Sequence, residues 1–559
     1  MSPGEDTTLL AADDAAREAA LDVRRSFVVQ APAGSGKTEL LIQRILALLA
    51  VVDRPERVLA ITFTRKAAGE MRERVVRALA SAREPVDEAS LQPHELKTRE
   101  LARAALARDR AEGWNLILHP SRLAIQTIDA LAQAIALQAP LASGLPPAPR
   151  FTDDARPLHL AAARAAIVEA AADDPRWRRL LEHQDNDADA LAGRIVDLLA
   201  RRDQWRTLAT AGAGDLRTIL ERTLRAEVEG ELAQIAGTIA RADFRPVAAV
   251  ARAVVAHLGP GDEALARTLE ACADAGDAPK LRCEAIDAWR ELAGWLLKQD
   301  GRELRKSPSK MRGVPVVGQG PGREARRTHY SAVRECLEAL GTVPGLSGAL
   351  ATVASLPPTR YDDEAWERIA ALLSLLPRFA ARLELEFLAR REFDFPKGTL
   401  GALAALGDAD APTDLLLRLD LRIEHLLVDE FQDPSYAHLD LIGRLVAGWS
   451  GDDGRTRFAV GDPMQSIYKF RGAEVRAFVE AITAGAIEGV PVERLTLRRN
   501  FRSHSGLVDW VNARFPAVLG GINEPGQGRV AFADAIAVRP VEPGEAVTRD
   551  VARDEAAEA

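Results

Sequence analysis

Residues 27–49 place a short apolar run, a glycine-rich loop and an amphipathic pattern in immediate succession. The run FVVQA (27–31) leads into APAGSGKT (31–38), and leucine and isoleucine then recur at helical spacing from Leu41 to Leu49. This order of strand, loop and helix is the beginning of a βα unit. It favours an α/β fold built around a parallel sheet.

The loop APAGSGKT fits the Walker A pattern for nucleoside triphosphates, except that Ala31 replaces its first glycine. Gly34 and Gly36 allow backbone N–H groups to turn toward phosphate oxygens, and the following helix adds the positive end of its dipole. We expect Lys37 to reach the β- and γ-phosphates and Thr38 to coordinate Mg²⁺. A chance glycine-rich turn is the alternative, which the strand–loop–helix context disfavours. The expected nucleotide site comprises Ala31, Pro32, Ala33, Gly34, Ser35, Gly36, Lys37 and Thr38.

Further strand-like runs lie on both sides of a long helical block. They are found at 58–63, 123–128, 425–430, 457–462 and 493–497. Between the second and third of these five, residues 150–390 are rich in alanine, leucine, arginine and glutamate with helical periodicity. A chain of 559 residues is too long for one core, so two to four domains are expected.

Composition narrows the class of protein. Hydrophobic residues make up 47% and charged residues 28%, which is an ordinary globular balance. The net charge of −9 argues against a histone-like binder and requires any nucleic-acid contact to be local. Three cysteines without a C-x-x-C pair disfavour a structural zinc or iron–sulfur site. The N-terminus lacks an apolar signal region and the uncharged run 130–149 is broken by prolines, so we expect a cytoplasmic protein.

A pair of carboxylates ends one apolar run. In HLLVDEFQD (425–433), Asp429 and Glu430 follow directly on the strand. Ligands of open α/β sheets bind beyond the carboxyl ends of strands. We expect Asp429 to hold Mg²⁺ through water and Glu430 to orient and deprotonate an attacking water molecule. The alternative is a solvated acidic turn.

A second motif, GDPMQSIYKFRGA (461–473), follows another apolar run. Gln465 has the reach to contact a γ-phosphate and report its loss. Tyr468 and Phe470 stand two residues apart beside basic Arg471, an arrangement that suits the stacking of nucleobases. The alternative is that the two rings are ordinary core aromatics.

These motifs together carry a resemblance. APAGSGKT, ITFTRKAA, TIDAL, VDEFQD, GDPMQSIYKFRGA and LRRNFRS occur in this order. The chain thereby resembles the UvrD/Rep-like superfamily 1 DNA helicases, especially their RecB/AddA-like branch. The resemblance implies a RecA-like P-loop motor domain with a large all-helical insertion. The implied divisions are 1–149 and 395–490 for the first motor domain, 150–394 for the insertion, and 491–559 for a truncated second motor domain with a disordered tail.

The resemblance also implies roles for individual residues. It places Thr62, Phe63, Thr64 and Thr127 along a DNA track, and it assigns base stacking to Tyr468 and Phe470. Phe501 matches an aromatic that stacks on adenine. Arg502 matches an arginine that contacts the γ-phosphate.

The function implied by the resemblance is an ATP- and Mg²⁺-dependent 3′–5′ DNA helicase in repair or recombination. Lys37, Glu430, Gln465 and Arg502 would be its catalytic residues. Its partners would be single-stranded DNA, duplex ends, and a nuclease or a second helicase half, with no membrane. Two alternatives stay open: an ATP- and DNA-binding module with little unwinding, and the motor component of a helicase–nuclease complex. An unrelated P-loop kinase does not explain the aromatic motif.

The sequence also departs from this family. Residues 11–21 contain no glutamine where relatives usually have one that reads adenine, and Glu39 stands where many have arginine. Nothing after residue 515 resembles the later helicase motifs, and no nuclease signature is visible. We therefore expect the chain by itself to bind ATP but turn it over poorly. A basic segment at 301–327 is expected to be an exposed loop, with contact to DNA as the alternative.

Overall fold

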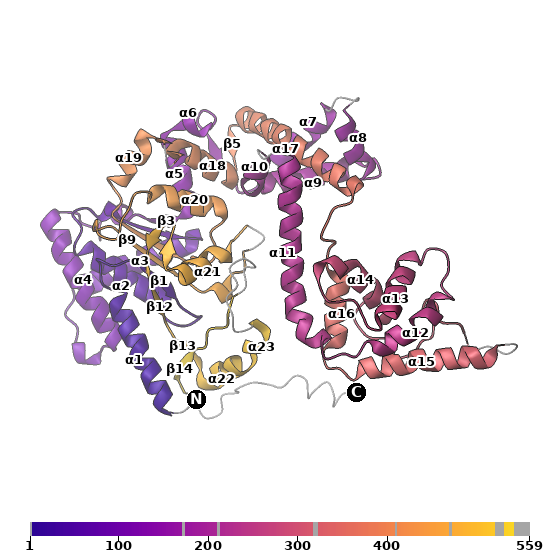
Figure 1. Cartoon of the computed structure of the whole chain (residues 1–559). Helices are drawn as coiled ribbons and strands as arrows, with labels where there is room; N and C mark the ends of the chain where they lie inside the picture. The colour runs from indigo at the N-terminus through magenta and orange to yellow at the C-terminus, as the bar shows by residue number, and fades with distance from the viewer. Residues whose placement is uncertain are drawn as a thin grey trace, which may run out of the picture. The chain divides into compact units, whose positions relative to one another are not determined.

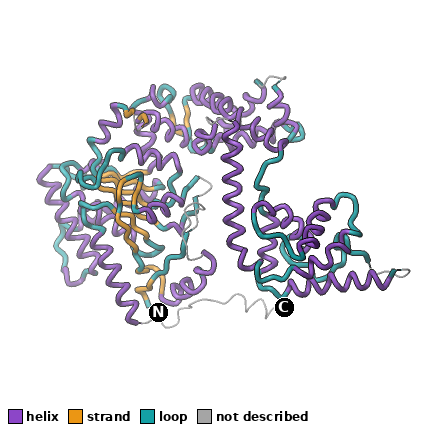
Figure 2. Tube along the Cα trace, viewed as in Figure 1, coloured by secondary structure: helices purple, strands orange, loops and turns teal. Residues whose placement is uncertain are grey.

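The computed structural model describes residues 3–169, 174–209, 213–316, 322–408, 411–468, 472–519 and 530–540. The chain divides into two compact units (Figure 1). Unit 1 comprises Met1–Thr207 and Leu375–Ala559, and unit 2 comprises Leu208–Ser374. Figure 2 shows the strands gathered in unit 1, while unit 2 is dominated by helices.

Unit 1 is organised by a parallel sheet of six strands among the described residues, in the order β12-β1-β9-β8-β2-β3. Every neighbouring pair is parallel, so all six carboxyl ends lie at one edge of the sheet. The expected α/β class with a parallel central sheet is therefore confirmed. The strands are β1 (Phe27–Gln30), β2 (Val58–Thr62), β3 (Ile125–Thr127), β8 (His425–Asp429), β9 (Thr456–Gly461) and β12 (Glu493–Thr496).

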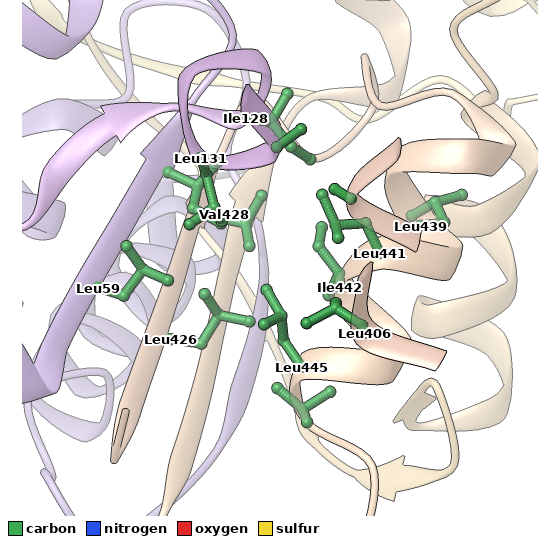
Figure 3. Packing of buried hydrophobic residues seen from close by; sticks show 14 of the residues in the cluster. Leu59, Ile128, Leu131, Leu406, Leu426, Val428, Leu439, Leu441, Ile442 and Leu445 are labelled. Carbon is green, nitrogen blue, oxygen red and sulfur yellow. The ribbon is translucent and has the colours of Figure 1, made fainter. Parts of the chain in front are cut away.

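The sheet is buried on both faces, because successive side chains of a strand point to opposite sides. Leu426 and Val428 of β8 face one core, and Leu427 faces the other. The first core packs against α5 (Ile128–Gln138), α18 (Phe395–Leu406), α20 (Tyr436–Leu445) and α21 (Val475–Ala484). In Figure 3, strand residues such as Leu59 and Leu426 face Leu445 and its neighbours on α20. The second core packs against α2 (Lys37–Leu49), α3 (Arg65–Ser81) and α4 (Pro93–Glu112).

Further helices and strand pairs belong to unit 1. The helices are α1 (Pro3–Ala19), α6 (Pro140–Ser143), α19 (Asp414–Asp420), α22 (Ser505–Arg514) and α23 (Pro516–Leu519). The two-stranded pairs are β4 (Arg150–Phe151) with β5 (Glu392–Phe393), β6 (Gly407–Asp408) with β7 (Ala411–Pro412), β10 (Ala486–Ile487) with β11 (Val490–Pro491), and β13 (Arg499–His504) with β14 (Ile536–Arg539).

The segment from residue 491 onward first contributes to the main sheet. β12 pairs with β1 at its edge, and only then does the chain enter β13 and β14. The tail expected to be disordered includes β14, whereas residues 541–559 lie outside the described part of the chain.

Unit 2 is a helical unit around a core that contains Trp289 and Trp295. Its helices are α11 (Ala213–Ile239), α12 (Arg245–Val255), α13 (Glu263–Ala275), α14 (Ile286–Leu296), α15 (Arg323–Gly341), α16 (Leu346–Ser355) and the first part of α17 (Asp363–Arg390). Cys272, Cys283 and Cys336 are buried here without disulfides. Burial raises the pKa of Cys272 to about 11 and that of Cys336 to about 12, so these thiols are inert.

The basic segment 301–327 is only partly a loop. Arg323, Arg326 and Arg327 lie in the first turns of α15, so the predicted loop extended too far at this end. Arg312 pairs with Asp262 at 3.0 Å, which ties the segment to the helical core. Residues 317–321 lie outside the described part of the chain.

Within the described residues, no single helix is both long and apolar enough to cross a membrane. One sharply bent pair, α15 with α16, meets the length and composition criteria only when the two helices are taken together.

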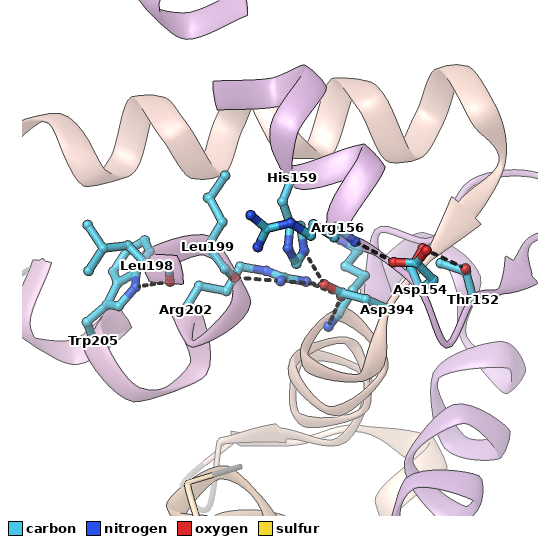
Figure 4. Close-up of polar contacts among 10 residues, drawn as sticks. Thr152, Asp154, Arg156, His159, Leu198, Leu199, Arg202, Trp205 and Asp394 are labelled. Carbon is cyan, nitrogen blue, oxygen red and sulfur yellow. Dashed lines mark hydrogen bonds and ion pairs between the residues drawn. The ribbon is translucent and has the colours of Figure 1, made fainter. Parts of the chain in front are cut away.

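A buried ionic cluster fastens helices of unit 1 to one another (Figure 4). Asp394 caps α18 by accepting the Lys397 N–H at 3.0 Å. Its side chain also binds Arg202 of α10 (Arg202–Ala209) at 2.8 Å and Nε2 of His159 of α7 (Arg156–Val168) at 2.8 Å. Burial opposes ionisation of Asp394, but the charge and hydrogen bonds of Arg202 and His159 overcome it and hold its pKa well below the usual range.

Two further helices contact this cluster, α9 (Ala188–Ala200) and the second part of α17, and α17 also packs against α8 (Pro175–Glu182) through Phe379 and Trp177. Arg202 also donates to the carbonyl of Leu199 at 3.0 Å, and its guanidinium lies 5.3 Å from the ring centre of Phe387. The arginine thus links the ends of α9 and α10 to α17, while Asp394 links it to α18.

We predict that Asp394→Ala lowers the free energy of unfolding by about 3–5 kcal/mol, because it leaves Arg202 buried without its counter-ion. Arg164→Ala is the control, since Arg164 makes an exposed ion pair with Asp189, and it should cost less than about 1 kcal/mol. Urea unfolding followed by circular dichroism measures both. Equal midpoints for the two variants would contradict a structural role for the cluster.

Candidate functional site

The glycine-rich loop lies at the carboxyl edge of the sheet, between β1 and α2. Gly34 and Gly36 adopt left-handed backbone with φ of 79° and 78°. A side chain on Gly34 would also come within 2.6 Å of Oδ1 of Asn500. The backbone of Ala31 is not left-handed, which explains why the missing first glycine of the pattern is tolerated. The loop therefore has the backbone conformation expected of a phosphate cradle.

Lys37, at the start of α2, forms an ion pair with Glu430 at 2.6 Å. Glu430 follows β8 in left-handed backbone, with φ of 52°, which costs a non-glycine residue about 1–3 kcal/mol. This turn interrupts the alternation of the strand, so that Glu430 reaches the loop lysine. The structure thus brings together the two residues that the sequence assigned to phosphate binding and water activation.

The site around the Lys37–Glu430 ion pair contains more carboxylates than Lys37 alone can neutralise. Burial and then repulsion by Glu430 raise the pKa of Asp429 to about 6 and that of Asp433 to about 7, although Lys37 opposes both shifts. Burial likewise raises the pKa of Asp462. The site holds more potential negative charge than Lys37 can neutralise, which favours the approach of a divalent cation. The sequence analysis did not predict a role for Asp433, although it is the last residue of the motif HLLVDEFQD (425–433).

The residues present fit a Mg²⁺–triphosphate group. Ser35 Oγ and Asp433 Oδ1 are both buried, and within the described chain neither has a hydrogen-bond partner. No group of three or more acidic, histidine or cysteine side chains converges on a point among the described residues. Mg²⁺ commonly uses one or two carboxylates together with phosphate and water oxygens, and Asp429 and Asp433 lie buried at this edge of the sheet. Thr38, in the first turn of α2, is partly exposed.

A hydrogen-bond chain connects the loop lysine to the aromatic motif. Nε2 of Gln432 donates to Glu430 at 2.8 Å, and Oε1 of Gln432 accepts the Asp462 N–H at 3.0 Å. Asp462 in turn accepts a hydrogen bond from Nε2 of Gln465. Gln432 and Asp462 are almost fully buried, so solvent does not compete for these bonds. The sequence prediction included Gln465 but missed the two residues that link it to Glu430.

Phe63, predicted to lie along the DNA track, and Tyr468, predicted to stack on a base, lie against each other. The rings of Phe63 and Tyr468 are 4.6 Å apart between centres and tilted by 38°. Phe63 follows β2 and Tyr468 follows the short 3-10 helix Pro463–Gln465, and both side chains are partly exposed. Phe470 and Arg471 lie outside the described residues.

The three threonines predicted to line the track differ in exposure. Thr64 is exposed and caps α3 by accepting the Ala67 N–H at 3.1 Å. Thr127 is buried and caps α5 by accepting the Ala130 N–H at 3.1 Å. Thr62 is buried at the end of β2. The capping of α5 is therefore enough to explain why a threonine stands at position 127, without a contact to DNA.

β13 covers the outer side of the loop. Asn500 donates through Nδ2 to the carbonyl of Ala33 at 3.0 Å, and the Phe501 N–H donates to the carbonyl of Gly34 at 2.8 Å. Both Phe501 and Arg502 are exposed, and Arg502 Cβ lies close to Gly34. The structure thus brings β13, with Phe501 and Arg502, to the loop, although Asn500 and Ala33 are 467 positions apart in the chain.

Comparison with known proteins agrees with this geometry. A family model described as UvrD/REP helicase N-terminal domain matches residues 12–192 and 353–484. Curated proteins named as subunits of an ATP-dependent helicase/nuclease are similar over most of this chain. The one from Pelotomaculum thermopropionicum is 28% identical over 91% of this chain and 38% of its own length. Those from Moorella thermoacetica and Lacticaseibacillus casei are 30% and 25% identical, over 90% and 92% of this chain and 34% and 40% of their own lengths. The chain therefore spans less than half the length of these relatives.

We predict that Asp433→Asn stabilises the ligand-free protein in EDTA, by about 2 kcal/mol above pH 7. Asp433 has a folded-state pKa of about 7, above the value of an unfolded aspartate. Its ionisation therefore destabilises the fold increasingly from about pH 4 upward, and fully above pH 7. The gain should shrink as the pH falls below 7 and vanish near pH 4. Thermal unfolding across this range measures it, and a pH-independent gain would contradict the assignment.

Proposed function

Because this chain belongs to the UvrD/REP helicase N-terminal domain family, we propose that it is an ATP-driven DNA helicase motor. It would hydrolyse ATP, translocate 3′ to 5′ along single-stranded DNA and unwind duplexes during DNA repair or recombination. The observation that carries the proposal is the hydrogen-bond chain from Lys37 through Glu430, Gln432 and Asp462 to Gln465. It joins the phosphate loop to the motif that contains the stacking aromatics.

In the proposed nucleotide site, backbone N–H groups of residues 31–38 cradle the phosphates. Mg²⁺, held by Thr38 and Asp429, would supply charge neutralisation at the β- and γ-phosphates. Lys37 would release Glu430 and bind phosphate oxygens, because the Glu430 carboxylate and the phosphate compete for the same ammonium group. Glu430 is then free to accept the proton of the attacking water, and Arg502 approaches the γ-phosphate from β13.

The proposed coupling between the nucleotide site and the DNA platform uses the same exchange of partners by Lys37. When Lys37 leaves Glu430, Gln432 remains as the partner of that carboxylate and of the Asp462 backbone. A shift of Glu430 is therefore transmitted through Asp462 to Gln465 and the residues that follow it. Phe63 and Tyr468 lie at the end of this path and form a platform on which a nucleobase can stack.

The proposed domain arrangement follows the motifs. Residues 1–149 and 395–490 form the first motor domain, to whose sheet β12 also belongs, and 150–394 form the helical insertion. The part of 491–559 that follows β12 is assigned to a second motor domain. The relatives are named as subunits of a helicase/nuclease, so a nuclease partner is part of the proposal, as are single-stranded DNA and duplex ends. ATP binding with little unwinding by this chain alone is the competing outcome.

We predict that Glu430→Gln retains nucleotide binding but lowers DNA-stimulated ATP hydrolysis by about 10²–10⁴-fold, because the amide cannot accept the proton of water. Lys37→Ala should weaken ATP binding itself, by about tenfold or more. Phosphate release and equilibrium nucleotide binding separate the two effects. Lys97→Ala, a change in an exposed pair with Glu100, is the matched control and should behave as wild type. Wild-type turnover by Lys37→Ala would refute the nucleotide site.

For the DNA platform, we predict that Tyr468→Ala and Phe63→Ala each weaken binding of single-stranded DNA by about 1–3 kcal/mol. Stacking releases no counter-ions, so the slope of affinity against salt concentration should stay unchanged. Tyr468→Phe keeps the ring and should bind like wild type. Fluorescence anisotropy at several salt concentrations measures these quantities. A changed slope, or full affinity without the ring, would rule out a stacking role.

A further inference from the structure

The helix α1 joins the phosphate loop to β13 through one buried carboxylate. Asp13 is almost fully buried. One of its oxygens accepts Nε of Arg17 at 2.7 Å, and the other accepts the backbone N–H groups of Arg498 at 2.6 Å and Arg499 at 3.2 Å. Asp13 therefore fixes the start of β13 and the orientation of Arg17 at the same time.

Arg17 spans the gap between loop and strand. Its Nη2 donates to the carbonyl of Ser35 at 2.7 Å. Its guanidinium carbon lies 5.3 Å from the ring centre of Phe501, within the range of a cation–π contact. A Cβ on Gly36 would meet both of them, at 3.6 Å from Arg17 Nη1 and 3.7 Å from the Phe501 ring. Arg17 and Phe501 therefore lie together over the second glycine of the loop.

The ring held in this way is not itself part of a core. Phe501 remains 49% exposed although Arg17 contacts it and its own N–H is bonded to the loop. An exposed aromatic ring fixed beside a phosphate loop is placed to stack on the base of a bound nucleotide. Residues 11–21, most of which lie in α1, contain no glutamine that could read the edge of adenine.

We propose that Asp13, Arg17 and Phe501 form a nucleobase clamp, in which Arg17 is a positioning residue that holds the Phe501 ring for stacking. This inference rests on the proposed nucleotide site and specifies how that site takes the base. Arginine has only N–H donors, and Nε and Nη2 of Arg17 are engaged by Asp13 and Ser35. Adenine and guanine offer the same N7 acceptor and similar ring faces, so the clamp accepts purine nucleoside triphosphates with little discrimination.

The test compares ligands with and without a base. Isothermal titration calorimetry without DNA measures binding of ATP, GTP and inorganic tripolyphosphate, each with Mg²⁺. For wild type, affinities for ATP and GTP should agree within about threefold. Arg17→Ala should weaken both by roughly tenfold and tripolyphosphate by less than about twofold. Arg17→Lys should resemble Arg17→Ala, because an ammonium group cannot replace the planar fork.

Further variants separate the clamp from other roles. Phe501→Ala should reproduce the pattern of Arg17→Ala, and the double variant should show no additional loss, because both changes remove one platform. Arg24→Ala, an exposed arginine of the same segment, should bind all three ligands as wild type. Thermal unfolding confirms that each variant is folded.

Three results would overturn the clamp. These are an equal loss of tripolyphosphate and ATP binding in Arg17→Ala, additive losses in the double variant, or a hundredfold preference of wild type for ATP over GTP. The first would mean that Arg17 acts only on the loop through Ser35. If Lys37→Ala leaves binding of all three ligands unchanged, the nucleotide site itself is refuted. If Lys37→Ala abolishes binding while Arg17→Ala has no effect, only the clamp fails.

Discussion

The ion pair between Lys37 and Glu430 joins residues that are 393 positions apart in the chain. It can form because β1 and β8 are parallel strands of one sheet, so the segments that follow them emerge at the same edge. On each side of the ion pair, a residue in left-handed backbone directs the chain toward this contact. Gly36 takes left-handed backbone before Lys37, and Glu430 takes it at a cost that the surrounding structure must offset. The hydrogen bonds that continue from Glu430 through Gln432 depend on this ion pair.

Around the ion pair, negative charges outnumber positive charges. This imbalance favours the binding of a cation but lowers the stability of the ligand-free fold. Asp429 and Asp433 have raised pKa values because they are buried beside Glu430 with one lysine for all three. A fold selected only for stability would not retain this repulsion. A divalent cation would relieve it by adding positive charge near the carboxylates, which would leave Lys37 able to exchange Glu430 for a phosphate chain. The proposed catalytic cycle begins from this exchange of partners.

The long helical segment must leave and re-enter the sheet without disturbing the site. The chain leaves after β3 and returns at β8, which lies beside β2 in the centre of the sheet. Asp394 and Arg202 fasten the helices near the point of return, through a buried pair that stays ionised. Beside the phosphate loop, Asp13 performs a similar task by accepting the backbone N–H groups of Arg498 and Arg499 at the start of β13. Buried carboxylates therefore fix the positions of segments that are distant in sequence.

The sequence by itself determined the local units. Apolar runs followed by glycines or carboxylates gave the strands and the loop conformation, because side-chain periodicity and left-handed glycine backbone are properties of a few adjacent residues. Lys37, Glu430 and Tyr468 were predicted in this way or through the motifs that resemble the family. Only the tertiary structure decided which distant groups meet: β12 at the edge of the main sheet, Gln432 and Asp462 between Glu430 and Gln465, and Arg17 over Phe501. These contacts, and the pKa of Asp433, arise from burial and from distances across the fold, which no local pattern of residues encodes.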